Sequence, residues 1–219
     1  MKIIVVSPHP DDETLGAAGT LLKYKEQGHQ IYWLNITDIR VDDGWEPEFV
    51  EKRRNQIKRI CEFFNFDGFY NLQYSPAQLD SVKESELIGE ISRCFKQIEP
   101  DWVILPDPND AHSDHDVVFR ASLACTKVFR YPSIKKVTTM EILSETDYGK
   151  PQNPFVPNYY VDISAYIDKK IEALKIYDTE LGEPPFPRSL KTIESLANLR
   201  GVTAGCMYAE AFKIIKMIE

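Results

Sequence analysis

Lys2-Ile-Ile-Val-Val-Ser-Pro-His-Pro-Asp-Asp-Glu13 is the segment most informative about the fold, and it lies near the start of a chain of 219 residues. Residues 3–6 form a continuous β-branched apolar run, which is typical of a strand covered on both faces. A polar turn follows, and leucine and alanine then recur at helical spacing from Leu15 to Leu22. A buried strand that leads through a polar turn into a helix indicates the first part of a βαβ unit.

The same alternation continues along the chain. Apolar runs predict further strands at Ile31–Thr37 and Trp102–Leu105, and helical spacing predicts helices over residues 46–64 and 87–98. Strands and helices that alternate at intervals of roughly 30 residues are typical of a parallel sheet. We therefore expect an α/β fold whose mostly parallel sheet is flanked by helices.

The later part of the sequence is less regular. Residues Lys136–Leu143 and Tyr159–Asp162 are predicted as strands, and Ile167–Leu174 as a helix. Proline-rich stretches at 151–157 and 184–187 are short enough to be loops rather than linkers. The expected organisation is one domain over residues 1–219 with an irregular C-terminal third.

Composition excludes several classes of protein. Hydrophobic residues make up 43% and charged residues 27% of the chain, which is typical of a globular protein and not of a disordered or fibrous one. With 34 acidic residues against 26 basic ones, the net charge of −8 argues against binding to nucleic acid. No apolar run is long enough for a transmembrane segment or a signal peptide, so we expect a cytoplasmic protein.

The cysteines indicate neither disulfides nor a thiolate metal site. They are widely separated, no Cys-x-x-Cys pair occurs, and most lie within apolar stretches. Reduced, buried thiols are therefore predicted for all of them: Cys61, Cys94, Cys125 and Cys206.

Two histidine clusters stand out, because they contain three of the four histidines. His9-Pro-Asp-Asp12 follows the first predicted strand, and His112-Ser-Asp-His115 follows the strand Trp102–Leu105 after a short loop. Ligands of open parallel sheets bind beyond the carboxyl ends of the strands. Both clusters lie on that edge, and they meet if the two strands are neighbours.

The residue types in these clusters suit a divalent metal. His9, Asp12 and His115 would form a two-histidine, one-carboxylate face that leaves positions open for water and substrate. Asp11 and His112 would remain beside it, as a carboxylate near a metal-activated water and an imidazole near a developing oxyanion. An isolated His-x-x-His pair is more often a surface or core pair, but two clusters on one edge favour the metal site.

Asp114 is close enough in sequence to hydrogen-bond His112 and to favour its protonated form. This would place a third polar side chain of the second cluster in the site.

These segments are similar to a known family. Ser7-Pro-His-Pro-Asp-Asp-Glu13, followed by Leu-Gly-Ala-Ala-Gly-Thr, resembles the N-terminal motif of the LmbE-like (PIG-L) N-deacetylases. The resemblance extends in order along nearly the whole chain, through Leu105-Pro106, Asp110, His112–His115, Asp162-Ile-Ser, the pattern Lys170-x-x-Ala-Leu174-x-x-Tyr177, and Gly205-x-x-Tyr208-Ala-Glu-Ala-Phe212.

The resemblance implies a Rossmann-like fold and a zinc-dependent hydrolase that removes the acetyl group from an N-acetylglucosamine-type sugar or conjugate. By motif position, His9, Asp12 and His115 would hold Zn²⁺, and the same ligand set accepts Fe²⁺. The partner would be a small amino-sugar substrate. Family members form various oligomers, so a homo-oligomer is compatible with the resemblance, although no symmetry follows from the sequence.

The resemblance also implies the roles of the remaining polar residues. Asp11 would be the general base and then the acid that protonates the leaving amine. His112 would stabilise the tetrahedral oxyanion, with Asp114 orienting it.

Three further residues carry open alternatives. Arg53 falls on the inward stripe of its helix, where it would contact substrate or form an internal salt bridge, and Gln56 stands where the family often has glutamate. Trp45 lies in the loop 35–45, which departs from the family pattern, and it would stack on a sugar ring or pack on its own domain. Glu210 would lie near the site or have a structural or surface role.

Two other functions remain to be distinguished. A two-histidine, one-carboxylate set also serves non-haem iron oxygenases, which would consume oxygen in the presence of iron and a reducing co-substrate. A non-catalytic amino-sugar-binding protein of the same fold would bind the sugar tightly without forming product.

Overall fold

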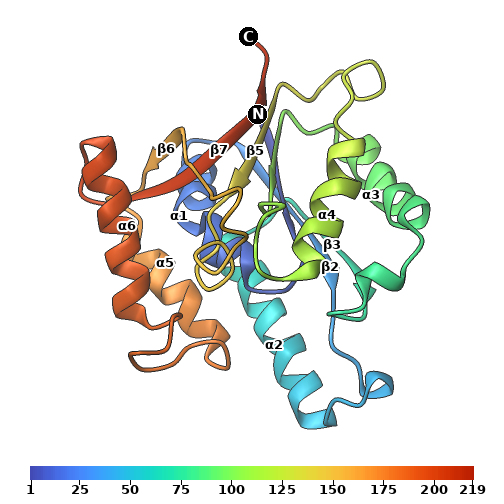
Figure 1. The fold of residues 1–219 in the computed structure, drawn as a ribbon, viewed down its shortest axis with the longest axis horizontal. Coiled ribbons are helices and arrows are strands. Elements are labelled where there is room, and N and C mark those ends of the chain that lie inside the picture. The colour runs from blue at the N-terminus through green and yellow to red at the C-terminus, as the bar shows by residue number, and fades with distance from the viewer.

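The computed structural model describes all 219 residues, and its centre is one sheet of seven strands (Figure 1). The strand order is β3-β2-β1-β4-β5-β7-β6; β1 to β5 run parallel, and β7 is antiparallel to both of its neighbours. The expected α/β fold with a mostly parallel sheet is thus confirmed. The strands are β1 (Lys2–Ser7), β2 (Gln30–Thr37), β3 (Gly68–Tyr74), β4 (Trp102–Leu105), β5 (Lys136–Met140), β6 (Tyr159–Asp162) and β7 (Ala209–Met217).

Helices cover both faces of the sheet. Successive side chains of β1 point to opposite faces, so Ile3 and Val5 belong to one apolar core whereas Ile4 and Val6 belong to the other. The first core packs α1, α2, α5 and α6 on one face, and the second packs α3 and α4 on the other (Figure 1). The helices are α1 (Asp12–Glu26), α2 (Pro47–Phe64), α3 (Glu84–Ile98), α4 (Ser113–Ala124), α5 (Ile167–Leu174) and α6 (Leu190–Ala204), with short 3₁₀ turns η1 (Val41–Asp43), η2 (Leu79–Ser81) and η3 (Lys175–Tyr177).

The position of the site follows from the strand order. β1 pairs directly with β4, although β2 and β3 lie between them in the sequence. The chain leaves β1 towards α1 on one face and leaves β4 towards α4 on the other. A sheet whose strand order reverses in this way has a crevice at the carboxyl ends of the two central strands.

The C-terminal third is more regular than the sequence predicts. It contains the long helix α6 and the strand β7, and the strand expected over Lys136–Leu143 ends at Met140. The buried face of α6 consists of Ile193, Ala197 and Gly201, so it has little hydrophobic contrast. A Cβ on Gly201 would lie 2.6 Å from the backbone of Met207, so glycine permits this close packing. Because Ala197 and Gly201 are small, the helix packs closely although its sequence shows no continuous apolar stripe.

The edge strand β3 was also missed by the sequence interpretation. Nearly all of its side chains are only half-buried, and the strand therefore lacks a continuous apolar run. No helix is long and apolar enough to span a membrane. All four cysteines are free as predicted; Cys94 and Cys125 are buried, but Cys61 and Cys206 are only half-buried.

Candidate metal centre and active site

The two histidine clusters meet at the crevice between β1 and β4. His9 follows β1, while His112 and His115 lie at the start of α4. The ring centroid of His9 is 4.3 Å from that of His112 and 5.4 Å from that of His115. Neighbouring parallel strands thus bring together residues about a hundred positions apart, as the sequence interpretation required.

The turn between β1 and α1 presents its carboxylates through an unusual backbone. Asp11 caps α1 with φ 147° and ψ −26°, a conformation that side chains rarely adopt and that often marks a functional turn. Its carbonyl accepts a hydrogen bond from Leu15 N–H at 2.8 Å, which starts the helix. The backbone N–H of His9 donates to Asp12 Oδ2 at 2.9 Å. The two carboxylates are therefore fixed at the positively polarised N-terminus of a helix.

Three side chains offer ligand atoms to one point. Asp12 Oδ2 lies 3.4 Å from His9 Nδ1 and 3.4 Å from His115 Nε2, and ligand atoms of these residues lie within 4.8 Å of one another. His115 Nε2 is completely buried and makes no hydrogen bond. A buried ring nitrogen without a hydrogen-bond partner and the carboxylate beside it form a donor set that a divalent cation would bind. The residues present thus fit a metal.

Each of the two histidines has a carboxylate at its other ring nitrogen. His9 Nε2 lies 3.1 Å from Asp114 Oδ2, and His115 Nδ1 lies 2.8 Å from Asp110 Oδ2. When these nitrogens donate to the carboxylates, His9 Nδ1 and His115 Nε2 keep their lone pairs for the metal. Asp110 and Asp114 therefore set the tautomers of the candidate ligands.

The electrostatics of the cluster also favour a cation. Burial lowers the pKa of His9, but hydrogen bonds to Asp114 and Asp12 outweigh it and raise the pKa to about 9. The pKa of His115 is raised to about 10, since the charge of Asp12 and the hydrogen bond to Asp110 overcome burial. Without metal, both imidazoles are therefore protonated at neutral pH because of the neighbouring carboxylates. A bound divalent cation would take the place of these protons.

Asp11 lies beside this ligand set and has a different environment. Its side chain is almost completely buried, and Arg188 Nη1 donates to its Oδ2 at 2.7 Å. Burial raises the pKa of Asp11 to about 7, although the charge of Arg188 lowers it. A carboxyl group that titrates near neutral pH is suited to take up and release a proton.

The structure places Asp114 differently from the expectation. Its carboxylate lies 3.9 Å from His112 Nδ1, too far for a hydrogen bond, because it accepts from Ala77 N–H at 2.7 Å and contacts His9. The backbone N–H of Asp114 instead donates to His112 Nδ1 at 3.1 Å. Burial and the charge of His9 lower the pKa of His112, and they outweigh the charge of Asp114, which raises it. Asp114 thus favours the protonated form through its charge, as expected, but without the expected hydrogen bond and without deciding the net shift.

Arg53 is buried on the inward face of α2, as the sequence predicts. Its Nη1 donates to the carbonyl of Pro10 at 2.8 Å, and its Nη2 donates to Glu180. The internal salt bridge therefore exists, and the same side chain also lines a pocket next to Asp11.

That pocket has a volume of about 340 Å³ and extends from His9 and Asp11 to an aromatic pair. Trp45 stacks on Phe49 with ring centroids 5.6 Å apart and an interplanar angle of 14°. Trp45 is 40% exposed. It thus packs on its own chain and lines the pocket as well, so the two alternatives for this residue are compatible.

The part of the chain that contains both histidine clusters is similar in sequence to a known protein family. The sequence pattern of the PIG-L family (GlcNAc-PI de-N-acetylase) matches residues 4–126, more than half of the chain. The chain belongs to the PIG-L family. A curated relative of this PIG-L chain is the diacetylchitobiose deacetylase of Thermococcus kodakarensis, with 24% identity over 226 residues, which cover 98% of this chain and 83% of the relative.

Solved structures share the fold of this PIG-L chain. The N,N′-diacetylchitobiose deacetylase of Pyrococcus horikoshii aligns with a TM-score of 0.76 and 21% identity, over 98% of this chain and 84% of that one. The 4-carboxy-2-hydroxymuconate hydratase of Pseudomonas putida KT2440 aligns with a TM-score of 0.73 and 16% identity, over 98% and 95%. Because a deacetylase and a hydratase share the fold, the chemistry has to be argued from side chains.

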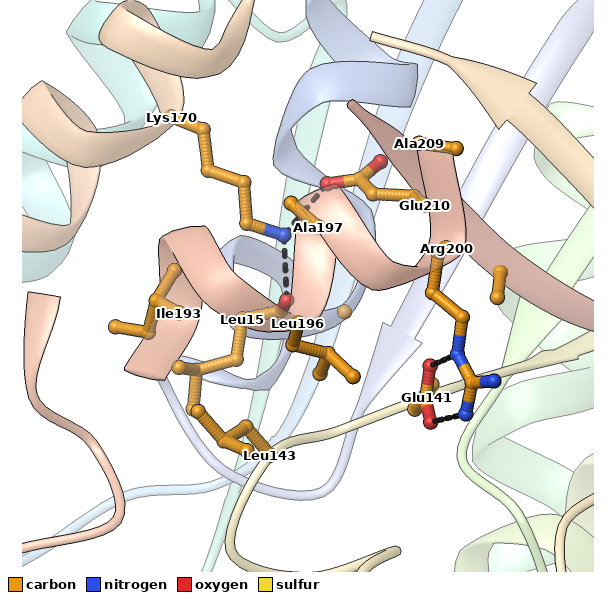
Figure 2. Close-up of a pocket in the computed structure, with 12 residues that line it drawn as sticks. Leu15, Glu141, Leu143, Lys170, Ile193, Leu196, Ala197, Arg200, Ala209 and Glu210 are labelled. Carbon is orange, nitrogen blue, oxygen red and sulfur yellow. Dashed lines mark hydrogen bonds and ion pairs between the residues drawn. The ribbon is translucent and has the colours of Figure 1, made fainter. Parts of the chain in front are cut away.

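In this PIG-L chain Glu210 has a structural role. Its carboxylate accepts hydrogen bonds from the backbone N–H groups of Gly19 and Thr20 at 2.9 and 2.7 Å. Lys170 donates to Glu210 at 2.7 Å and to the carbonyl of Leu15 at 2.7 Å, as Figure 2 shows. The buried ion pair thus joins β7 and α5 to the middle of α1.

The cavity beside this ion pair is small. It has a volume of about 20 Å³, which is room for about one water molecule. Arg200 and Glu141 form a second ion pair at its rim (Figure 2). This cavity cannot hold a sugar.

Sequence interpretation missed Arg188, which has four side-chain partners. It donates to Asp11 and contacts Glu180, and it also donates to Ser144 at 2.6 Å and Glu145 at 3.2 Å. Its position one residue after the proline-rich stretch 184–187 shows no helical or strand pattern, so no signal in the sequence pointed to it.

Proposed function

We propose that this chain is a metal-dependent N-deacetylase, most simply a zinc enzyme, that hydrolyses the acetamide of an N-acetylglucosamine-type sugar. The observation that carries this proposal is the set of half-buried His9 with buried Asp12 and His115, which has Asp11 and a pocket directly beside it. Membership of the PIG-L family supports it. The relative from Thermococcus kodakarensis is a diacetylchitobiose deacetylase, which supports the choice of an amino sugar.

The three ligands would hold the ion through His9 Nδ1, Asp12 Oδ2 and His115 Nε2. Bound there, a divalent metal supplies a Lewis acid that polarises the acetamide carbonyl and makes water more acidic. Asp110 and Asp114 keep the histidines in the ligating tautomers.

Asp11 carries the proton. Its carboxylate takes a proton from the attacking water while the water oxygen bonds to the acetamide carbon. When the C–N bond breaks, Asp11 returns the proton to the leaving nitrogen, and the products are acetate and the free amine. Burial, which raises the pKa of Asp11, favours uptake of the proton, and the charge of Arg188, which lowers it, favours release.

His112 stabilises the negative oxygen of the tetrahedral species. Because its Nδ1 accepts a hydrogen bond from Asp114 N–H, the neutral ring carries its proton on Nε2. The lowered pKa of His112 favours this neutral form. His112 therefore acts as a neutral hydrogen-bond donor to the oxyanion, and Arg53 contacts the sugar from the wall of the pocket.

The test combines metal content with amine release. Purified protein is given N-acetylglucosamine, its short oligomers and conjugates, with and without chelator, and free amine is measured. Release that is abolished by chelation and restored by zinc is the expected result. Asp11→Asn should keep its metal and lose about two to four orders of magnitude in kcat. Asp42→Asn is the matched control, since Asp42 is exposed and outside the pocket.

Two outcomes would contradict the proposal. A folded protein that binds no metal would exclude the mechanism. Bound metal with no amine release from any of these substrates would favour the alternatives, and oxygen uptake with iron and a reductant would then identify an oxygenase. Tight binding of the sugar without product would identify a binding protein.

A further inference from the structure

The pocket contains a carboxylate that the proposed reaction does not use. Asp38 follows β2, lines the pocket and is 8% exposed. Its Oδ1 is buried without a hydrogen-bond partner. Burying an unpaired carboxylate oxygen costs free energy, so a ligand with a hydroxyl donor would be stabilised here.

Neighbouring amides fix Asp38 as a hydrogen-bond acceptor. Asn71 Oδ1 accepts from Asn35 Nδ2 at 3.0 Å and from Gln73 N–H at 3.3 Å. Asn71 therefore directs its Nδ2 to Asp38 Oδ2, to which it donates at 2.8 Å. One carboxylate oxygen is thus held in place, and the other is left to accept a hydrogen bond from a ligand.

The loop after Asp38 holds an aromatic platform against the pocket. Trp45 lies parallel to Phe49, and both line the pocket. Arg40 donates to Asp43 at 3.2 Å, and both side chains bond to Ser75 from the loop after β3. These hydrogen bonds hold the loop in place without a ligand. A preorganised Trp45 favours stacking on the apolar face of a sugar ring.

The charges of the lining argue against an anionic substrate. Asp11, Asp38 and Glu180 supply three carboxylates, while Arg53 is the only basic side chain other than His9. The guanidinium of Arg53 already pairs with Glu180 and the Pro10 carbonyl. Away from the metal ligand His9, a phosphate or carboxylate beside Asp38 would meet a like charge, and the one guanidinium of the lining is already paired.

We propose that this pocket selects an uncharged sugar, whose ring stacks on Trp45 and Phe49 and whose hydroxyl donates to Asp38. The inference rests on the proposed deacetylase function and deepens it. It makes Asp38 a specificity-determining residue of this chain that excludes anionic conjugates.

The test compares an uncharged with an anionic substrate. N,N′-diacetylchitobiose and N-acetylglucosamine 6-phosphate are supplied to the metal-loaded protein, to Asp38→Asn and to the matched control Asp42→Asn. Asparagine places an N–H donor where Asp38 has its free oxygen, so kcat/KM for diacetylchitobiose should fall roughly tenfold or more, mainly through KM. The preference for the uncharged sugar over the phosphate should shrink, because a negative charge is removed. Asp42→Asn should match the wild type in both.

A second variant covers the case in which Asp38→Asn does not fold. Trp45 is partly exposed, so Trp45→Leu should keep the melting temperature and metal content. It should weaken use of diacetylchitobiose by roughly fivefold, from lost stacking. Phe129→Leu, at an aromatic residue outside the pocket, is the control.

The outcomes separate this inference from the proposed function. Amine release with unchanged kcat/KM in folded Asp38→Asn and Trp45→Leu, or wild-type preference for the phosphate, would overturn the inference alone. If the metal-loaded protein releases no amine, the proposed function fails. Calorimetric binding of diacetylchitobiose to wild type and to both variants then decides the inference by itself, with weaker binding to the variants supporting it and equal binding overturning it.

Discussion

Arg188 donates a hydrogen bond to the carboxylate of Asp11 across 2.7 Å, although the two residues are 177 positions apart in the chain. The same guanidinium donates to Glu145, beyond β5, at 3.2 Å. Arg188, in the loop before α6, thus connects the loop after β5 with Asp11, the proposed general base. It also offsets part of the effect of burial, which by itself raises the pKa of Asp11.

Arg188→Ala should therefore slow the reaction without removing the metal. Loss of the guanidinium raises the pKa of Asp11, so a larger fraction is protonated at neutral pH and the acid limb of the rate profile moves to higher pH. We expect kcat at pH 7 to fall roughly tenfold. Steady-state kinetics against pH, with metal content measured in parallel, would check this. Arg120→Ala, at a half-exposed salt bridge on α4, is the control; an unshifted acid limb in Arg188→Ala would contradict the prediction.

Asp110→Asn should weaken metal binding. The carboxylate accepts from His115 Nδ1 at 2.8 Å and so keeps Nε2 free as a ligand. Loss of such a partner typically lowers metal affinity about 10–100-fold. Competition with a chromogenic chelator would measure the change. Asp116→Asn, on α4 beside His115, alters a solvent-accessible carboxylate and should have no effect; equal affinities of the two variants would show that Asp110 does not orient the ligand.

Metal affinity should rise with pH. The pKa values of His9 and His115 are about 9 and about 10 without metal, so both rings are protonated at neutral pH and must lose protons to bind the ion. Affinity should therefore increase between about pH 6 and pH 9, by up to about tenfold per pH unit for each proton released. Calorimetry in buffers of different ionisation enthalpy would count these protons. Affinity that is independent of pH, or that falls across this range, would refute the proposed ligand protonation.

Glu210→Ala should destabilise the fold. It leaves Lys170 without its counter-charge and the N–H groups of Gly19 and Thr20 without their acceptor. Breaking a buried ion pair in this way costs about 3–5 kcal/mol. Denaturant unfolding would measure the loss, with Glu183→Ala as the exposed control. A change as small as that of the control would mean that the ion pair does not hold α1.

The sequence predicted the elements with strong patterns. β1 and β4 are buried on both faces, so their apolar runs identify them, and α3 has a clear apolar stripe. α6 packs through Ala197 and Gly201, and β3 lies half-exposed at an edge, so neither shows contrast between polar and apolar positions. Hydrophobic patterning detects burial of large side chains, and it fails where a helix packs through small residues or where a strand is only half-buried.

In the candidate site too, some contacts could be predicted from the sequence and others could not. The convergence of His9 with His115 was predictable, because the carboxyl ends of parallel strands lie on one edge. The contact of Asp114 with Ala77 was not, since it depends on the loop after β3, a strand without a sequence signal. Arg188 likewise reaches Asp11 through a loop whose path no local pattern determines.

The place of β7 in the sheet bears on the order of folding. β6 pairs with no strand other than β7, and Lys170 of α5 is buried against Glu210 of β7. During synthesis, the backbone of β6 and the ammonium group of Lys170 therefore remain without these partners until residues 209–217 have been made. β5 also exposes one edge until then. A chain stopped before residue 209 would carry the unpaired edges of β5 and β6 and a lysine without its counter-charge, so such fragments should be prone to associate with one another.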